Sequence, residues 1–123
     1  MNNDIQILIE TDYIEDQSSS SDERFVFAYT ITIENTGVIP AKLLSRHWVI
    51  TDSNGKIEEV EGDGVIGEQP IIQPGEAFSY TSGAILETDV GTMSGSYQMV
   101  DESGHPFDAD IPEFVLSIPR TLH

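Results

Sequence analysis

The sequence contains no cysteine, and this absence removes several kinds of chemistry at once. Disulfides, thiolate metal ligands, iron-sulfur clusters and cysteine nucleophiles are all excluded. The chain also lacks a basic N-terminal region followed by an apolar stretch, and no apolar run approaches the roughly 18 residues of a membrane-spanning helix. We therefore expect a soluble, cytoplasmic protein that does not bind membranes.

Basic residues are scarce: five lysines and arginines stand against 22 aspartates and glutamates, for a formal net charge of -17. Such a surface repels phosphate backbones and anionic lipids, so nucleic acid is not an expected partner either. Cations and basic protein surfaces would be attracted, although solubility is the simpler interpretation of the charge. The basic residues are scattered, at Arg24, Lys42, Arg46, Lys56 and Arg120.

Sustained helical periodicity is absent, and alternating apolar and polar residues take its place. The clearest alternation lies in residues 24–35, where apolar side chains occupy every second position from Phe25 to Ile33. One face of this strand therefore requires a second apolar layer. At 123 residues the chain is long enough for one core, so we expect a single domain over residues 1–123.

Turn signals divide the rest of the chain into short strands. We expect strands at residues 4–14, 41–52, 56–61, 76–86, 92–100, 107–111 and 113–118, with a short extended piece at 71–72. A polar loop is expected at 15–23, a hairpin turn at Asn54 and Gly55, and a bulge or a close backbone approach at Gly83. The pattern predicts an all-β fold, an antiparallel two-sheet sandwich of seven to eight strands, with a small barrel as the alternative.

Alternation in residues 41–52 places Arg46 on the same strand face as Leu44, Trp48 and Ile50. Trp48 is expected to be the largest side chain of the core. An arginine on this face has two interpretations: its head reaches water near the strand end, or it pairs with a carboxylate.

Residues 62–67, GDGVIG, match the GxGxxG pattern that cradles a pyrophosphate where a helix begins. A helix is excluded here by Pro70 and Pro74, and the surrounding carboxylates would repel an anion. We therefore favour a loop in which glycine adopts positive φ over a phosphate site.

Catalytic patterns are also missing. Ser94 does not lie in a Gly-x-Ser-x-Gly elbow. Neighbouring acids, at 58–59 and at 101–102, would point to opposite faces of a strand rather than flank a substrate. We therefore expect no catalytic residues and no enzyme activity.

Histidines do not show the short spacing of a transition-metal site. They occur at His47, His105 and His123. A composite site would form only if the fold brought His105 near Asp101 or Asp108. We therefore expect no metal site and no cofactor.

Three segments are more specific than these general patterns: ERFVFAYTITIENTG, LLSRHWVITDSNGKIEEVEGDGVIGEQPIIQPGEAFSYTSGAILETDVGTMSGSY and DIPEFVLSIP. Together they resemble the ApaG family over nearly the whole chain, as far as Ile118. The resemblance implies a fibronectin type III or immunoglobulin-like sandwich in a full-length, single-domain bacterial member. It also implies a link to cobalt resistance and magnesium efflux, and a gene commonly found beside one for a diadenosine tetraphosphate hydrolase.

The same resemblance bears on partners. Related domains in eukaryotic F-box proteins and in a polymerase-delta-interacting protein imply protein binding. The glycine-rich loop of the family, read as a pyrophosphate site, corresponds here to Gly62, Gly64 and Gly67. Because no membrane span is expected, any role in ion efflux would be indirect.

These observations leave three functional hypotheses open. The first is a non-enzymatic interaction module, a monomer or weak homodimer, whose sheet edges or end loops bind a protein partner. The second is binding of a pyrophosphate, nucleotide or other small anionic ligand at residues 62–67, with Arg46 or Lys56 supplying positive charge. The third is weak binding of a divalent cation, magnesium better than cobalt, by surface carboxylates such as Asp101, Glu102, Asp108 and Asp110.

Overall fold

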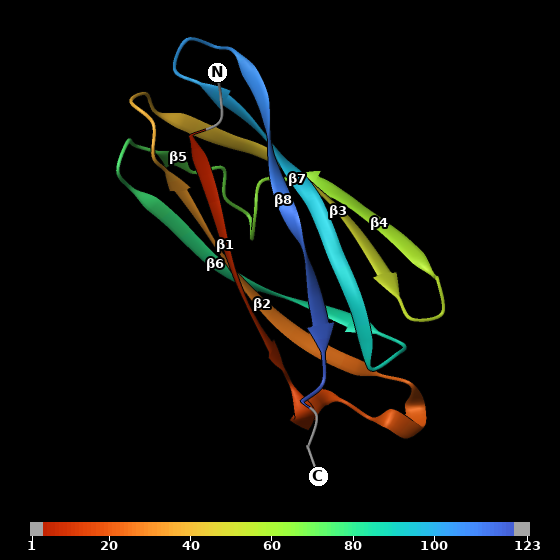
Figure 1. The fold of residues 1–123 in the computed structure, drawn as a ribbon. Helices are drawn as coiled ribbons and strands as arrows, with labels where there is room; N and C mark the ends of the chain where they lie inside the picture. Colours follow the sequence, from red (N-terminus) through yellow and green to blue (C-terminus); the bar gives the residue numbers. More distant parts are fainter. Residues whose placement is uncertain (1–3, 120–123) are drawn as a thin grey trace.

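The computed structural model describes residues 4–119, which form two antiparallel β-sheets (Figure 1). The strands are β1 (Ile5–Tyr13), β2 (Phe25–Asn35), β3 (Ala41–Asp52), β4 (Ile57–Asp63), β5 (Ile71–Ile72), β6 (Ala77–Leu86), β7 (Val90–Asp101) and β8 (Pro106–Ser117). One sheet has the order β1-β2-β6 and the other β4-β3-β7-β8, with β5 paired to β3. The predicted all-β antiparallel sandwich is confirmed. Arg120 and His123 lie outside the described residues.

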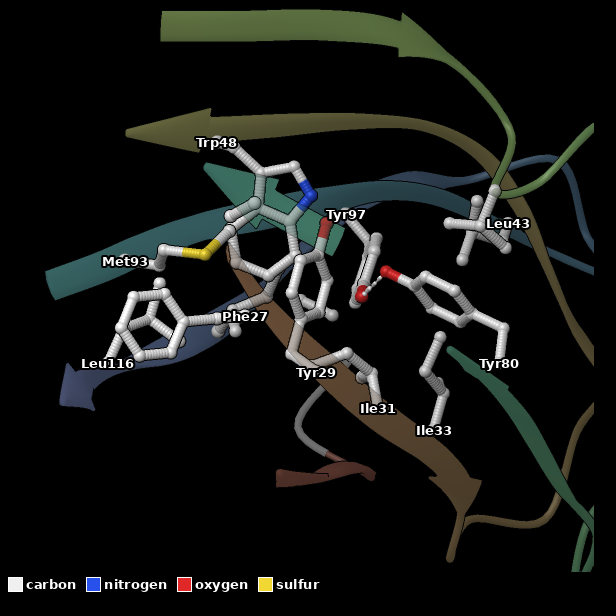
Figure 2. Close-up of a cluster of buried hydrophobic side chains, with 14 of the residues drawn as sticks. Phe27, Tyr29, Ile31, Ile33, Leu43, Trp48, Tyr80, Met93, Tyr97 and Leu116 are labelled. Atoms are coloured by element: carbon white, nitrogen blue, oxygen red, sulfur yellow. Dashed lines mark hydrogen bonds between the residues drawn. The ribbon is translucent and has the colours of Figure 1, made fainter. Parts of the chain in front are cut away.

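The core lies between the sheets and is organised around β2. Its alternate residues from Phe25 to Ile33 are buried, as predicted from the apolar alternation. Trp48 of β3 is only 2% exposed and meets the Tyr29 ring at a centroid distance of 5.4 Å (Figure 2). Aromatic pairs in this edge-to-face arrangement add to the free energy gained from burial alone.

The register of β3 is irregular in a way that simple alternation misses. Its pairing with β7 shifts between Leu43 and Ser45, so the residues on either side of this bulge exchange faces. Leu43, rather than the predicted Leu44, therefore joins Trp48 in the core. Beyond the bulge Arg46 shares the inner face with Trp48, whereas His47 faces outward.

The last strand is continuous where a break at Pro112 was predicted. β8 pairs with β7 on both sides of this proline, and the ladder shifts register between Met93 and Gly95 of β7. Proline lacks an N–H group, and an edge strand can hold it because one side of that strand has no ladder to complete.

Two local predictions need refinement. The polar loop at 15–23 contains two 3-10 turns, Glu15–Gln17 and Ser20–Asp22. Gly83 is not a bulge, since the β2–β6 register is continuous there, and its Cβ position would lie 3.4 Å from the Phe27 carbonyl oxygen. Among the described residues there is no helix with the length and hydropathy of a membrane span.

The end of β2 carries a buried polar side chain, Asn35, which is 2% exposed. Its Nδ2 donates to the carbonyl oxygens of Ile39 at 2.8 Å and Ile72 at 2.9 Å, and its Oδ1 accepts from the Gly37 N–H at 2.9 Å. Hydrogen bonding on every side explains how an amide is tolerated there. Asn35 thereby joins β2 to the following turn and to β5.

Four long strands form the margins of the two sheets: β1, β6, β4 and β8. Three of them carry acidic residues, and β8 also carries prolines. Charges and prolines on an edge oppose pairing with another strand. β6, with the sequence AFSYTSGAIL, has neither over its ten residues.

The ladder also shows which peptide groups of β6 point away from β2. The Asn35 N–H donates to the Glu76 carbonyl at 3.0 Å, whereas on the other side of β2 the Thr36 N–H donates to Asp4. Because bonded and non-bonded pairs alternate along an antiparallel ladder, even-numbered residues of β6 bond β2. The N–H and C=O groups of the odd-numbered residues point away from the sheet, at Ala77, Ser79, Thr81, Gly83 and Ile85.

Candidate functional site

An open depression with a volume of about 640 Å³ lies on the outer face of the β4-β3-β7-β8 sheet. Seven of its nine lining residues face outward on four neighbouring strands, where residues of paired strands lie side by side, whereas Arg46 and Gly62 occupy inward positions of β3 and β4. Its lining consists of Ser45, Arg46, His47, Glu61, Gly62, Asp63, Ser96, Gln98 and Asp108. Arg46 and part of the glycine-rich segment therefore border one concave surface.

Polar side chains in this depression bond to one another. Ser45 Oγ donates to Gln98 Oε1 at 2.8 Å, and Gln98 Nε2 donates to Ser96 Oγ at 2.9 Å. His47 Nε2 lies 2.9 Å from Glu59 Oε1 and 3.9 Å from Glu61 Oε2. The serine hydroxyls are thus connected through an amide, and the imidazole is oriented by carboxylates.

Arg46 bonds backbone carbonyl oxygens instead of the carboxylate that the second interpretation required. It is half-buried, and its Nη1 donates to the carbonyl oxygens of Gly64 at 2.9 Å and Asp63 at 3.2 Å. A Cβ on Gly62, its partner across the β3–β4 ladder, would lie only 2.8 Å from the guanidinium. The arginine thus holds the chain where it leaves β4, and a larger residue at Gly62 would force the guanidinium to move.

The loop after β4 uses its amide groups internally. The Gly64 N–H donates to the Leu44 carbonyl at 2.8 Å, and Val65 and Glu68 exchange two backbone hydrogen bonds. Gly64 has φ +63°, and a Cβ there would lie 2.2 Å from the Glu68 carbonyl oxygen, so no other residue fits without rearrangement. The loop also inserts Val65 into the core, where it is fully buried. Packing and turn geometry therefore account for this part of the GxGxxG pattern.

The structure brings some of the predicted ligand residues together and separates others. Gly67 belongs to the same loop and has φ +80°, but it does not line the depression. Lys56 lies beyond the opposite end of β4, six residues or about 20 Å along the strand from Gly62. There its Nζ is 3.4 Å from Glu87 Oε1.

Relatives of known name match almost the full length of the chain. The ApaG domain model matches residues 15–101. Protein ApaG from Thiobacillus denitrificans is 60% identical over 119 residues, covering 97% of this chain and 94% of the relative. The chain belongs to the ApaG family. The crystal structure of the ApaA protein from Bordetella pertussis agrees with a TM-score of 0.93 at 49% identity, and covers 96% of both chains.

In this ApaG-family chain the carboxylates of the cation hypothesis lie in different surroundings. Asp101 closes the β7–β8 turn, where its Oδ1 accepts from the N–H groups of Ser103 at 2.8 Å and His105 at 3.1 Å. The bond from the His105 backbone is the main reason why the pKa of Asp101 is lowered. Asp108 instead borders the depression described above, away from Asp101 and Glu102, which line a different hollow.

His105 does approach Asp101, with Nδ1 3.6 Å from Oδ2, as the composite-site alternative required. Within residues 4–119, however, no group of three or more histidine, aspartate or glutamate side chains is arranged to hold a metal ion.

Sequence reasoning missed one buried polar pair of the ApaG-family chain. Tyr80 of β6 and Tyr97 of β7 join their hydroxyls across the core at 2.5 Å (Figure 2). Burial raises the pKa of Tyr80 to about 12 and that of Tyr97 still further. Alternation within one strand cannot reveal this contact, because it joins strands of opposite sheets.

Proposed function

We propose that this ApaG-family chain acts as a non-enzymatic interaction module that binds a protein partner. The observation that carries the proposal is the margin of β6, which bears no charged residue and whose outward peptide groups pair with no other strand among residues 4–119. Natural proteins protect exposed sheet edges, so an unprotected edge of ten residues indicates a place for another chain. Edges of this kind bind extended segments in several families of recognition domains.

The hydrogen bonds in the depression support a role in binding rather than in catalysis. A serine nucleophile needs a base at its hydroxyl, whereas Ser45 and Ser96 bond to Gln98. His47 is bonded to Glu59 on the neighbouring strand. We propose on this basis that the chain carries out no bond-breaking chemistry.

The link to cobalt resistance and magnesium efflux enters this proposal only through the partner. A cytoplasmic ApaG-family protein could affect ion handling by binding a component that itself contacts the ion. Weak binding of magnesium by surface carboxylates is a separate proposal. Equal, salt-sensitive responses to magnesium and cobalt would show that the ions only screen the surface charge and occupy no site.

Affinity capture tests the interaction module. The tagged full-length chain should recover a stoichiometric partner from a bacterial lysate at physiological salt. An unrelated protein of similar net charge serves as the control, because basic proteins adhere to any strongly acidic surface. Recovery of the same proteins on both baits, or of none, counts against the module.

A second candidate, binding of a small anion such as pyrophosphate, is favoured by one observation: Arg46 and Gly62 border the same depression. Glu61, Asp63 and Asp108 border it as well and oppose an anion there. Calorimetry with pyrophosphate should show weaker binding in Arg46→Ala and no change in Lys56→Ala, which lies at the far end of β4. The absence of heat with the wild-type chain would end this candidate.

A further inference from the structure

The margin of β6 is shaped to accept an added strand. Apart from Ile85, which is 54% exposed, its outward side chains are small, and two of them are turned toward β2 rather than over the free edge. Thr81 Oγ1 is bonded to Thr30 Oγ1 at 2.8 Å, and Ser79 Oγ is bonded to Thr32 Oγ1 at 2.6 Å. The peptide groups at Ser79, Thr81 and Gly83 can therefore be approached directly in the plane of the sheet.

The charges around this margin select the kind of strand. Ile85 of β6 shares a small hollow with Glu58 of β4 and with Glu87, while Lys56 in the same hollow is paired with Glu87. Alternation places Glu58 and Val60 on the face of β4 that is directed toward the other sheet. A strand added beside β6 would lie next to these carboxylates. Lysine or arginine side chains on that strand would be attracted, and glutamate side chains would be repelled.

A second copy of the chain is disfavoured as the occupant. Each copy carries a formal charge of -17, and pairing two β6 margins would bring both sets of flanking glutamates together. A helix is disfavoured because it would leave the outward peptide groups of β6 without partners.

We propose that the partner contributes an extended basic segment that adds to β6 as a further strand. This inference rests on the interaction module proposed above and specifies its docking site. Backbone hydrogen bonds to the odd-numbered residues of β6 would hold the segment, and its basic side chains would face Glu58 and the neighbouring carboxylates.

Amide hydrogen exchange on the full-length chain tests the geometry with defined probes. The first probe is a nonapeptide that alternates threonine and lysine. The second replaces each threonine by proline, which keeps the charge but removes the N–H groups that would bond β6 when the lysine side chains face Glu58. The first peptide should slow exchange at Ser79, Thr81 and Gly83 by about tenfold or more, since these amides become hydrogen-bonded. Equal effects of both peptides, slowing confined to β4, or no slowing at saturation would each overturn the proposal.

Variants at Thr81 separate the peptide group from the side chain. Thr81→Pro removes one outward N–H and should abolish the slowing, whereas Thr81→Val loses only the hydroxyl and should retain it. Thr81→Lys should weaken binding of the basic peptide more than Gln6→Lys does, because Gln6 adds the same charge on β1, at the opposite margin of the sheet. If Thr81→Pro does not fold, the comparison of Thr81→Lys with Gln6→Lys tests the docking site instead. Equal effects of the two lysine substitutions would overturn the docking site.

The captured partner distinguishes this inference from the proposed function. A partner that binds wild type and Thr81→Pro equally would refute docking on β6 and leave the module intact. Failure to capture any partner would refute the interaction module. The peptide experiment would still show whether the β6 edge accepts a basic strand. If the wild type self-associates and Thr81→Pro abolishes this self-association, the occupant of the β6 edge is a second copy of the chain rather than a basic segment. That result would overturn the inference.

Discussion

The β4 and β6 strands are both sheet margins, yet they are built in opposite ways. β4 is short, has no fully buried residue and carries acidic side chains along most of its length. β6 is longer, buries Tyr80, Ala84 and Leu86 on its inner face, and bears no charge. The strand that is firmly fixed in the core is thus the one left open at its edge, whereas the loosely held strand is protected by charge.

The largest effect that separates the two strands is expected from truncating their inward side chains. Leu86→Ala should lower the free energy of unfolding by about 2–5 kcal/mol, because Leu86 is 4% exposed and its removal leaves a cavity. Val60→Ala on half-buried β4 should lower it by about 1 kcal/mol or less. Urea unfolding measures both, and similar losses at the two sites would contradict the comparison.

The next effect concerns the bond that ties β6 to the opposite sheet. Tyr97→Phe removes one hydroxyl and leaves that of Tyr80 buried without its partner, which should lower the free energy of unfolding by about 1–3 kcal/mol. β4 has no comparable tie, so Glu59→Gln serves as the control and should cost less, since its bond to His47 is exposed.

The same tyrosines predict a dependence on high pH. The pKa of Tyr80 is about 12 in the folded chain against 10.0 for the ordinary group, so the unfolded chain loses this proton first. Stability from this group is fully present below pH 10 and is lost as the pH rises through about 12. Urea midpoints measured across this range should fall for wild type and fall less for Tyr80→Phe.

Removing the charges of β4 should convert it into an edge like β6. The triple substitution of Glu58, Glu59 and Glu61 by threonine leaves β-forming side chains without repulsion. We expect self-association to strengthen by about tenfold, equivalent to ~1.4 kcal/mol, in sedimentation experiments. An unchanged association constant would show that charge is not what protects this margin.

The smallest effect is expected at the ion pair that connects the two margins. Lys56 and Glu87 are 62% and 60% exposed, so Lys56→Ala should change the free energy of unfolding by less than about 1 kcal/mol. A larger loss in thermal or urea unfolding would mean that this contact helps to position β6 beside the β3–β4 turn.

The predictable parts of this fold are those determined by local alternation. The inner face of β2 could be read from its own residues, because aromatic and β-branched side chains repeat there every second position. The bulge between Leu43 and Ser45 could not, since it is set by pairing with β7, which lies about fifty residues later. The open margin of β6 likewise depends on sheet order, although its lack of charge is visible in the sequence.

The candidate site was predictable only in outline. Arg46 and Gly62 were both singled out, but their contact arises from the β3–β4 register. The partners of the guanidinium proved to be backbone carbonyl oxygens, which every residue carries and which no side-chain pattern reveals. The interpretation of Arg46 as paired with a carboxylate, one of the two left open, came from considering side chains alone.

The bonds of Asn35 have a practical consequence for engineering. One amide fastens the segment at 36–40 and the segment at 70–72, so neither can be exchanged for a foreign sequence without disturbing the other. Grafts intended to display new peptides on this scaffold are better placed at the Ser53–Gly55 or Glu102–Gly104 turns, which do not contact this amide.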